Sequence, residues 1–271
     1  MDDADFYLED LKSKFKKINP KEYYLSYSGG KDSHFLYWFI KNILKDEDIQ
    51  IISVNTLFEH IEILDRMKKY SDKVLIPVIR HKELKEKYGI PCFSKHQDEY
   101  IMRYQRGCRT EHTMDIIYGR KTALYGFSKK PRELLLSDKL HKISSKCCYY
   151  LKKKPLMDYE KVSGRKAIVG LRKGEGILRR QFKSCFTKEK KFMPILDLSD
   201  ELMDKICMKY NIEIPYVYRH IRRTGCFGCP YGKNIIKELS LLNDAQRRFV
   251  KEYFKESYDV IDKNIMIQPH L

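Results

Sequence analysis

The segment that decides the fold is Tyr23-Tyr24-Leu25-Ser26-Tyr27-Ser28-Gly29-Gly30-Lys31-Asp32-Ser33. Its aromatic beginning, 23–27, predicts a short strand, and the apolar residues of 33–44 predict a buried helix. Two consecutive glycines between them allow a tight turn that aims backbone N–H groups at an anion, and the helix adds its positive N-terminal end. The segment therefore predicts a phosphate-binding loop between a strand and a helix.

The side chains of this loop, Ser28 to Ser33, suit the same ligand. Both serines can donate hydroxyl hydrogen bonds, Lys31 supplies a mobile cation, and Asp32 can cap the helix or approach a phosphate-bound Mg²⁺. We expect Gly30 to take a positive φ and to let the phosphate approach closely. The string lacks the Gly-x-x-x-x-Gly-Lys-Ser/Thr pattern, which disfavours a kinase-type P-loop. An ordinary capped turn is the alternative interpretation.

Outward from the loop, strands alternate with helices. Strands at 49–55 and 74–78 are each followed by a helix, at 59–70 and 82–88, which predicts an α/β fold with a mostly parallel sheet and helices on both faces. Such sheets place ligands beyond the carboxyl ends of their strands. Further expected elements are helices at 98–105, 111–118, 199–210 and 243–255 and a strand at 167–170. We divide the chain into an N-terminal helix (1–20), a nucleotide-binding domain (21–200) and a C-terminal helical part (201–271).

The loop resembles the Ser-Gly-Gly-x-Asp-Ser fingerprint of the PP-loop ATP pyrophosphatases, which have the adenine nucleotide alpha hydrolase-like fold. The resemblance implies a bound adenine nucleotide, either ATP cleaved between its α and β phosphates or an adenylylsulfate-type nucleotide. Loop residues Ser28, Gly29, Gly30, Lys31, Asp32 and Ser33 would then hold the phosphates.

Two further segments resemble the phosphoadenosine phosphosulfate (PAPS) reductase family within that superfamily. Val54-Asn55-Thr56 is similar to its Asp-Thr-Gly-type segment, with Asn55 in place of the acidic residue and Leu57 in place of the glycine. The stretch from Gly170 to Arg179 is similar to its Gly-x-Arg-x-x-Glu-Ser-x-x-Arg motif, with Gly176 where serine is usual. The resemblance, which covers about 22–232, implies nucleotide contacts from Asn55, Thr56, Arg172 and Arg179. Arginine forks suit phosphate or sulfate, although a solvated basic helix is the alternative for the last two.

Eight cysteines in a chain of cytosolic type favour metal binding over disulfides. Two close pairs stand out, Cys147-Cys148 and Cys226-Phe227-Gly228-Cys229. Four thiolates suit zinc or an iron–sulfur cluster, and adjacent cysteines reach the separate irons of a cubane more easily than one zinc ion. The spacing resembles that of the 4Fe-4S adenylylsulfate reductases, as does the segment that contains Lys152. We predict a 4Fe-4S cluster, with zinc as the alternative.

Four residues are the predicted catalytic set: Lys31, Asp32, Lys152 and Arg172. Sulfonucleotide reductases of this family use a cysteine near the C-terminus, whereas this chain ends in Ile265-Met266-Ile267-Gln268-Pro269-His270-Leu271. The leading hypothesis is therefore ATP-dependent adenylylation coupled to sulfur insertion, with nucleic-acid thiolation or phosphorothioation proteins as the nearest comparison. A sulfonucleotide reductase with an external nucleophile and a non-catalytic nucleotide-sensing subunit are the alternatives.

The balance of basic and acidic residues indicates the kind of partner that the chain binds. Lys and Arg number 54 against 37 Asp and Glu, a formal net charge of +17, which favours an anionic partner such as a nucleotide or nucleic acid. A sulfur-donor protein is a further expected partner. No apolar run reaches the roughly 20 residues of a membrane helix and the first residues are acidic, so we expect a cytoplasmic protein without a membrane partner.

Overall fold

The computed structural model describes residues 2–120, 127–175, 177–222 and 224–261. The sequence-based interpretations of Gly176 and 265–271 lie outside these residues. The chain forms two compact units. Unit 1 comprises Met1–Asn55, Ile61–Ile76 and Pro155–Thr224, and unit 2 comprises Thr56–His60, Pro77–Lys154 and Gly225–Leu271. The units thus interleave along the chain, whereas the sequence suggested consecutive parts divided at residues 20 and 200.

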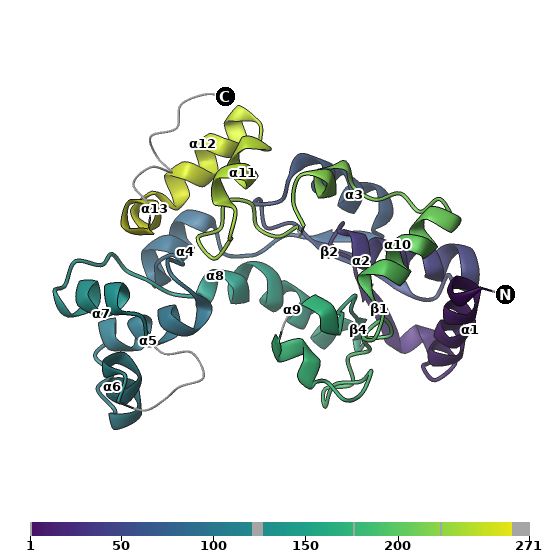
Figure 1. Cartoon of the computed structure of the whole chain (residues 1–271), viewed down its shortest axis with the longest axis horizontal. Helices are drawn as coiled ribbons and strands as arrows, with labels where there is room; N and C mark the ends of the chain where they lie inside the picture. The colour runs from purple at the N-terminus through teal and green to yellow at the C-terminus, as the bar shows by residue number, and fades with distance from the viewer. Residues whose placement is uncertain (1, 121–126, 176, 223, 262–271) are drawn as a thin grey trace. The chain divides into compact units, whose positions relative to one another are not determined.

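Unit 1 is built on a four-stranded sheet with the order β3-β2-β1-β4. Figure 1 labels β1, β2 and β4 of this sheet. The strands are β1 (Tyr23–Ser26), β2 (Gln50–Val54), β3 (Lys73–Leu75) and β4 (Lys166–Ile168). Each pairing is parallel, β1 with both β2 and β4, and β2 with β3. The predicted α/β class with a mostly parallel sheet is confirmed.

One face of the sheet packs against α9 (Lys154–Ser163). Tyr24, Ile52 and Ala167 come from three neighbouring strands and form a buried cluster on this face. The ring of Tyr24 meets that of Tyr159 in α9 edge-on, with centroids 4.9 Å apart. Side chains alternate between the two faces along a strand, so the neighbours of Tyr24 must be covered by other elements.

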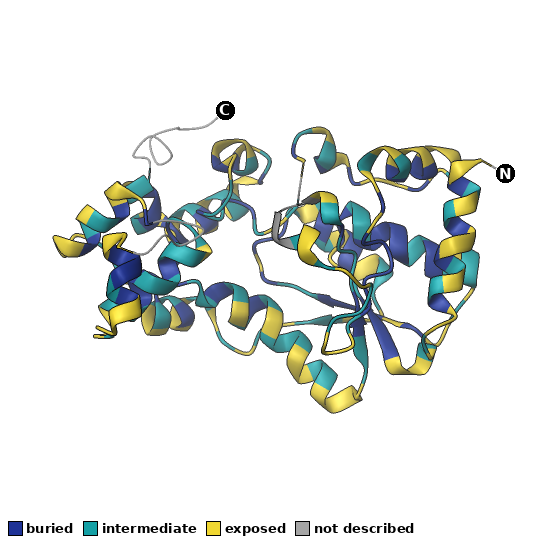
Figure 2. Ribbon diagram, turned by 60° about the horizontal axis from the view of Figure 1, so that its bottom comes forward, coloured by how far each residue is buried: buried dark blue, intermediate teal, exposed yellow. Residues whose placement is uncertain are grey.

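The opposite face is covered by the N-terminal helices. Tyr23 contacts Phe192, and Phe192 contacts Phe15 at the end of α1 (Asp3–Phe15). Phe15 in turn packs on Phe39, which follows α2 (Lys31–Trp38) at the start of a π-helical segment, Phe39–Leu44. Helices therefore cover both faces. The residues of β1, β2 and β4 are mostly buried, whereas those of β3 are exposed or half-buried (Figure 2). Unit 1 also contains α3 (Ile61–Tyr70), α10 (Asp200–Lys209) and the 3-10 helices Pro20–Glu22, Lys173–Glu175, Ile177–Gln181 and Tyr216–Arg219.

The described part of unit 2 is mainly helical. Its helices are α4 (His81–Tyr88), α5 (Lys95–Gln105), α6 (Glu111–Tyr118), α7 (Lys129–Leu136), α8 (Lys146–Cys148) with the π-helical segment Tyr149–Lys153, α11 (Ile235–Ser240), α12 (Asp244–Tyr253) and α13 (Lys255–Ile261). Ser94 and Thr110 cap α5 and α6 with their side chains, which fixes where these helices begin. Residues from α5, α6 and α7, including Ile101, Ile117 and Leu135, form its core. The predicted helices 98–105 and 111–118 are both present.

Among the helices that the structure describes, none is both long and apolar enough to span a membrane.

Candidate functional sites

The loop that begins at Ser28 connects β1 to α2 in unit 1, as predicted, and phosphate binding by this loop stays a prediction. The positive φ expected at Gly30 falls instead on Gly29, with φ +72°, while Gly30 has φ −80° and caps α2. A Cβ on Gly29 would lie 2.9 Å from Cγ2 and from the carbonyl oxygen of Ile63 in α3. Only glycine combines this conformation with this close approach.

Two hydroxyl groups leave no room for a side chain at Gly30. A Cβ at this position would lie 2.7 Å from Tyr218 Oη and 2.9 Å from Thr224 Oγ1. The Lys31 backbone N–H donates to Tyr218 Oη over 3.0 Å, and Tyr218 Oη is also 3.0 Å from Thr224 Oγ1. Sequence reasoning gave neither residue a role at the loop, because both are far from it in the chain.

The two serines of the loop hold its shape. Ser33 Oγ donates to the Gly30 carbonyl over 3.0 Å, accepts the Ser28 N–H over 3.2 Å and lies 3.0 Å from Ser28 Oγ. Ser33 itself is buried. Its hydroxyl therefore braces the turn from inside, whereas Ser28 stays exposed.

Lys31 and Arg172, the two cations predicted for this site, both form ion pairs with carboxylates. Lys31 Nζ lies 2.5 Å from Asp204 Oδ1 in α10. Arg172 is buried and donates from Nε to Asp32 Oδ1 over 2.8 Å and from Nη1 to Asp200 Oδ1 over 2.7 Å. The structure thus brings Lys31, Asp32 and Arg172 together around the start of α2.

Burial opposes ionisation of the Asp32 carboxyl. It raises the pKa of the Asp32 carboxyl, against the charge of Arg172, which lowers it. Hydrogen bonding to Arg172 instead holds the pKa of the Asp200 carboxyl below its usual value. A phosphate arriving at Lys31 and Arg172 would therefore take the place of carboxylates that are already in contact with them.

The other predicted nucleotide contacts lie on neighbouring segments. Asn55 follows β2, and its N–H donates to the Leu75 carbonyl over 2.9 Å. Arg179 lies in the 3-10 helix Ile177–Gln181. The nucleotide contacts of both residues stay predictions.

Thr56 belongs to unit 2 and is turned toward its own segment. Its N–H and Oγ1 donate to the Glu59 carboxylate over 2.9 and 2.6 Å, and Oγ1 lies 3.8 Å from Cys226 Sγ. Leu57, at the position of the family's glycine, has φ +65°. The backbone thus keeps the left-handed conformation that glycine favours, although leucine occupies it.

The four paired cysteines all lie in unit 2. Cys147 and Cys148 form α8, and Cys226 and Cys229 lie in the turn before α11. A hydrogen bond to Cys148, burial, and the charges of Cys229 and Cys226 raise the pKa of the Cys147 thiol. The hydrogen bond to Cys147 lowers the pKa of Cys148 to about 6, assisted by neighbouring lysines. The four thiols are therefore close enough to influence one another.

Lys152 lies beside this thiol group. The charge of Cys226 is the main cause that raises the pKa of the Lys152 ammonium, and a hydrogen bond to the same thiol and the charge of Glu59 add to it. Burial raises the pKa of the Cys226 thiol, and the charge of Lys152 lowers it by a smaller amount. Across residues 2–120, 127–175, 177–222 and 224–261, no set of three or more His, Cys, Asp or Glu side chains is arranged to hold a metal ion. Cluster binding by these cysteines stays a prediction.

The four unpaired cysteines lie elsewhere. Cys92 and Cys207 are buried, and burial raises the pKa of both thiols, that of Cys207 to about 11. Cys108 and Cys185 are partly buried.

No protein-family model matches the chain, and no curated protein matches it. Among solved structures, the phosphoadenylyl-sulfate (PAPS) reductase from Candida auris, in a phosphate complex, is similar with a TM-score of 0.45. The two are 13% identical, and the match covers 79% of this chain and 83% of that chain.

Proposed function

We propose that the chain is an adenine-nucleotide enzyme that activates an acceptor by adenylylation and allows sulfur to replace the activated oxygen. The observation that carries this proposal is the convergence of the Gly29 turn, the start of α2, Lys31 and Arg172 in unit 1. Backbone donors at a helix N-terminus together with two cations suit a polyphosphate. The carboxylates now facing these cations show that the site tolerates negative charge at both positions.

The proposed reaction has two displacements. An acceptor oxygen attacks the α-phosphorus of ATP, the bond to the bridging α,β oxygen breaks, and pyrophosphate leaves with the electron pair. Lys31 and Arg172 would stabilise the charge that develops on this leaving group. Asp32, adjacent to both, would orient Arg172 or approach a phosphate-bound Mg²⁺. A hydrosulfide from a sulfur donor then displaces AMP. The acceptor oxygen leaves as part of AMP, and a sulfur atom takes its place on the acceptor.

The thiols of unit 2 fit an iron–sulfur cluster by their chemistry. Cys147, Cys148, Cys226 and Cys229 are a four-thiol donor set whose charges interact, and Lys152 would offset the negative charge of their thiolates. When bound, such a cluster would supply an iron that holds a sulfide, or it would place a fixed charge beside Lys152. Lys152 would act on the thiolates through its ammonium, since its hydrogen bond runs to Cys226.

The experiment is a pyrophosphate-release assay with anaerobically purified protein, ATP, sulfide and a nucleic-acid acceptor pool. We expect release that Lys31→Ala and Arg172→Ala abolish, whereas Lys17→Ala, an exposed lysine just after α1, leaves it unchanged. Sulfite release from adenylylsulfate without pyrophosphate release from ATP would replace the proposal with a reductase. Nucleotide binding without any turnover would replace it with a nucleotide-sensing role.

A further inference from the structure

Unit 2 contains a cavity of about 940 Å³ that no part of the proposed chemistry uses. Its walls come from the segment between α4 and α5, from the start of α7, and from the chain between the second cysteine pair and α11. This volume lies near the upper end of the ~300–1,000 Å³ typical of small-molecule sites. The cavity is therefore large enough for more than a bound ion.

Among the described residues that line the cavity, every charged side chain is cationic. They are Lys130 in α7, Lys233 in the loop before α11, and Lys237 within α11. Among residues 2–120, 127–175, 177–222 and 224–261, no aspartate or glutamate lines the cavity, and none of the three lysines forms an ion pair. All three are exposed at its rim. Unpaired lysine ammonium groups from three segments suit an anion with more than one charge, of which phosphate is the common biological form.

The same cavity offers apolar and amide surfaces. Phe93, Ile235 and Pro131 contribute the apolar part, and Gln97 and Asn234 carry amides that both donate and accept hydrogen bonds. An aromatic face beside amide groups is how proteins hold an unstacked base, whereas a simple phosphate ion needs neither. Phosphate-binding cations together with these surfaces describe a nucleotide unit.

The cavity also adjoins the thiol group in the chain. Its wall includes Pro230 and Gly232, directly after Cys229, and the Gly232 N–H donates to the Cys229 carbonyl over 2.7 Å. The turn that carries the second cysteine pair is thus continuous with the cavity wall. A ligand bound here would lie against the segment that positions Cys229.

We infer that this cavity binds a nucleotide unit of a nucleic-acid strand, separately from the phosphate loop of unit 1. The role of that strand as sulfur acceptor rests on the proposed function, but its binding rests on the cavity alone. A free nucleotide has the same chemistry, so the test includes both sources.

The test measures the fluorescence anisotropy of a short fluorescein-labelled oligouridylate with the full chain, and competition by free uridine monophosphate. Uracil is chosen because the loop of unit 1 is expected to select adenine nucleotides. We expect Lys233→Gln/Lys237→Gln to weaken oligonucleotide binding about tenfold or more, and to reduce its dependence on salt concentration. Phe93→Leu should weaken binding while leaving the salt dependence unchanged, because it removes the aromatic ring and keeps both the charge and an apolar side chain that packs on the core of unit 2.

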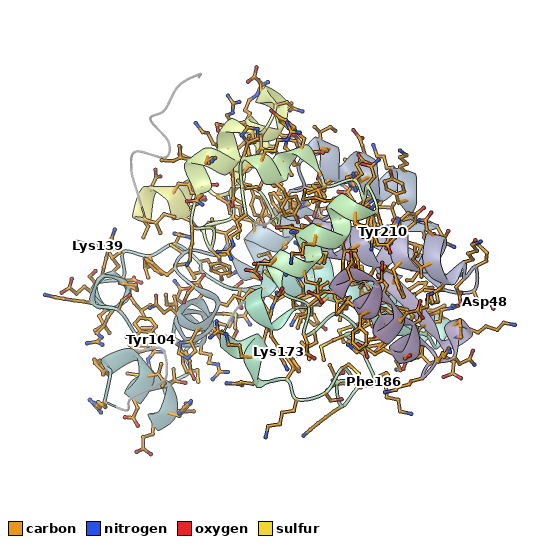
Figure 3. The ribbon with its side chains drawn as sticks, turned by 45° about the vertical axis from the view of Figure 1, so that its right-hand side comes forward. Asp48, Tyr104, Lys139, Lys173, Phe186 and Tyr210 are labelled. Atoms are coloured by element: carbon orange, nitrogen blue, oxygen red, sulfur yellow. The ribbon has the colours of Figure 1, made fainter. Side chains whose placement is uncertain are left out.

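The matched control is Lys82→Gln/Lys139→Gln, which removes the same charge from exposed positions of unit 2 outside the cavity. Lys139, labelled in Figure 3, follows α7 and is exposed. Equal weakening by both double variants would assign binding to overall surface charge and overturn the inference. Absence of oligonucleotide binding to the unaltered chain, with or without free-nucleotide binding, would overturn the nucleic-acid source.

Different results would contradict the proposed function and the inference about the cavity. The Lys233→Gln/Lys237→Gln variant should keep the affinity of unit 1 for ATP, whereas Lys31→Ala should keep oligouridylate affinity. If pyrophosphate release is absent but oligouridylate binding responds to the cavity variants, the inference stands and the proposed function falls. If pyrophosphate release is present and the cavity variants bind oligouridylate normally, the inference falls alone.

Discussion

Lys31 and Asp204 form an ion pair in unit 1, with 2.5 Å between Nζ and Oδ1, so the cation of the phosphate loop faces a carboxylate of α10. A nucleotide phosphate would compete with this carboxylate for the same ammonium group. The Asp204 side chain is 55% exposed, so the pair itself contributes only about 0–1 kcal/mol to stability. Its effect should therefore appear in nucleotide affinity.

Asp204→Asn is expected to tighten ATP binding a few-fold, because it removes the competing charge and keeps the shape of the side chain. Lys31→Ala should weaken binding by about 1.5–3 kcal/mol, roughly tenfold to hundredfold. Calorimetric titration of ATP measures both. In the double variant the tightening should vanish, and a tightening that persisted without Lys31 would show that Asp204 acts elsewhere.

Gly30→Ala is expected to impair nucleotide binding through crowding, since its Cβ would lie 2.7 Å from Tyr218 Oη. Adding Tyr218→Phe removes that oxygen and should restore part of the affinity. Gly174→Ala is the control, because nothing lies within 4 Å of a Cβ built there. Equal affinity of Gly30→Ala and the unaltered chain would contradict the close approach at this glycine.

Leu57→Gly is expected to raise the free energy of unfolding by up to about 1 kcal/mol, because leucine is strained at φ +65° and glycine is not. Urea denaturation monitored by circular dichroism measures the change. Leu136→Gly, at an exposed position at the end of α7, should lower the stability instead. A loss of stability in both variants would refute strain at Leu57.

Serine substitution at any one of Cys147, Cys148, Cys226 or Cys229 is expected to lower the iron content of anaerobically prepared protein, since each would lose a cluster ligand. The unaltered chain should contain close to four irons and four sulfides. Cys92→Ser is the control, as this buried thiol lies outside the interacting group. Stoichiometric zinc without sulfide, or equal iron loss in all five variants, would rule out the proposed ligand set.

The stability of unit 1 should fall as the pH is lowered from about 6.5 toward about 4, because of His34. This side chain is 5% exposed, and burial, reinforced by the charge of Arg66, lowers its pKa from 6.5 to about 4. The unfolded chain therefore binds the proton first as the pH falls, which costs up to about 3 kcal/mol of stability. Above pH 6.5 the imidazole is neutral in both states, so this contribution is constant.

Urea denaturation over this pH range should show a shallower slope for His34→Gln, which does not titrate. Some slope should remain, because burial also lowers the pKa of His141 in unit 2 to about 4. An unchanged slope in His34→Gln would remove His34 as the source.

Local pattern was sufficient for the elements around the loop. The strand predicted at 23–27 is found at Tyr23–Ser26, the helix predicted at 33–44 begins at Lys31, and the predicted parallel sheet is present. Residue periodicity and glycine placement were sufficient for these elements because short-range sterics and burial dictate them. Local pattern did not predict which of the two glycines has the positive φ. Two adjacent glycines permit the same turn, and the packing of Ile63 against Gly29 decides between them.

Sequence spacing named the cysteine pairs, and the family resemblance of the segment after Cys148 named Lys152; their proximity in unit 2 depends on chain segments that are far apart. Tyr218, Thr224, Asp200 and Asp204, in contrast, are ordinary residues in the sequence and join the loop only through folding. The cavity of unit 2 likewise unites three lysines that share no motif. The sequence by itself determined the strand–loop–helix and the donor atoms, since these depend on neighbours in the chain. The tertiary structure alone decided which carboxylates and hydroxyls meet them, because such contacts depend on how distant segments pack.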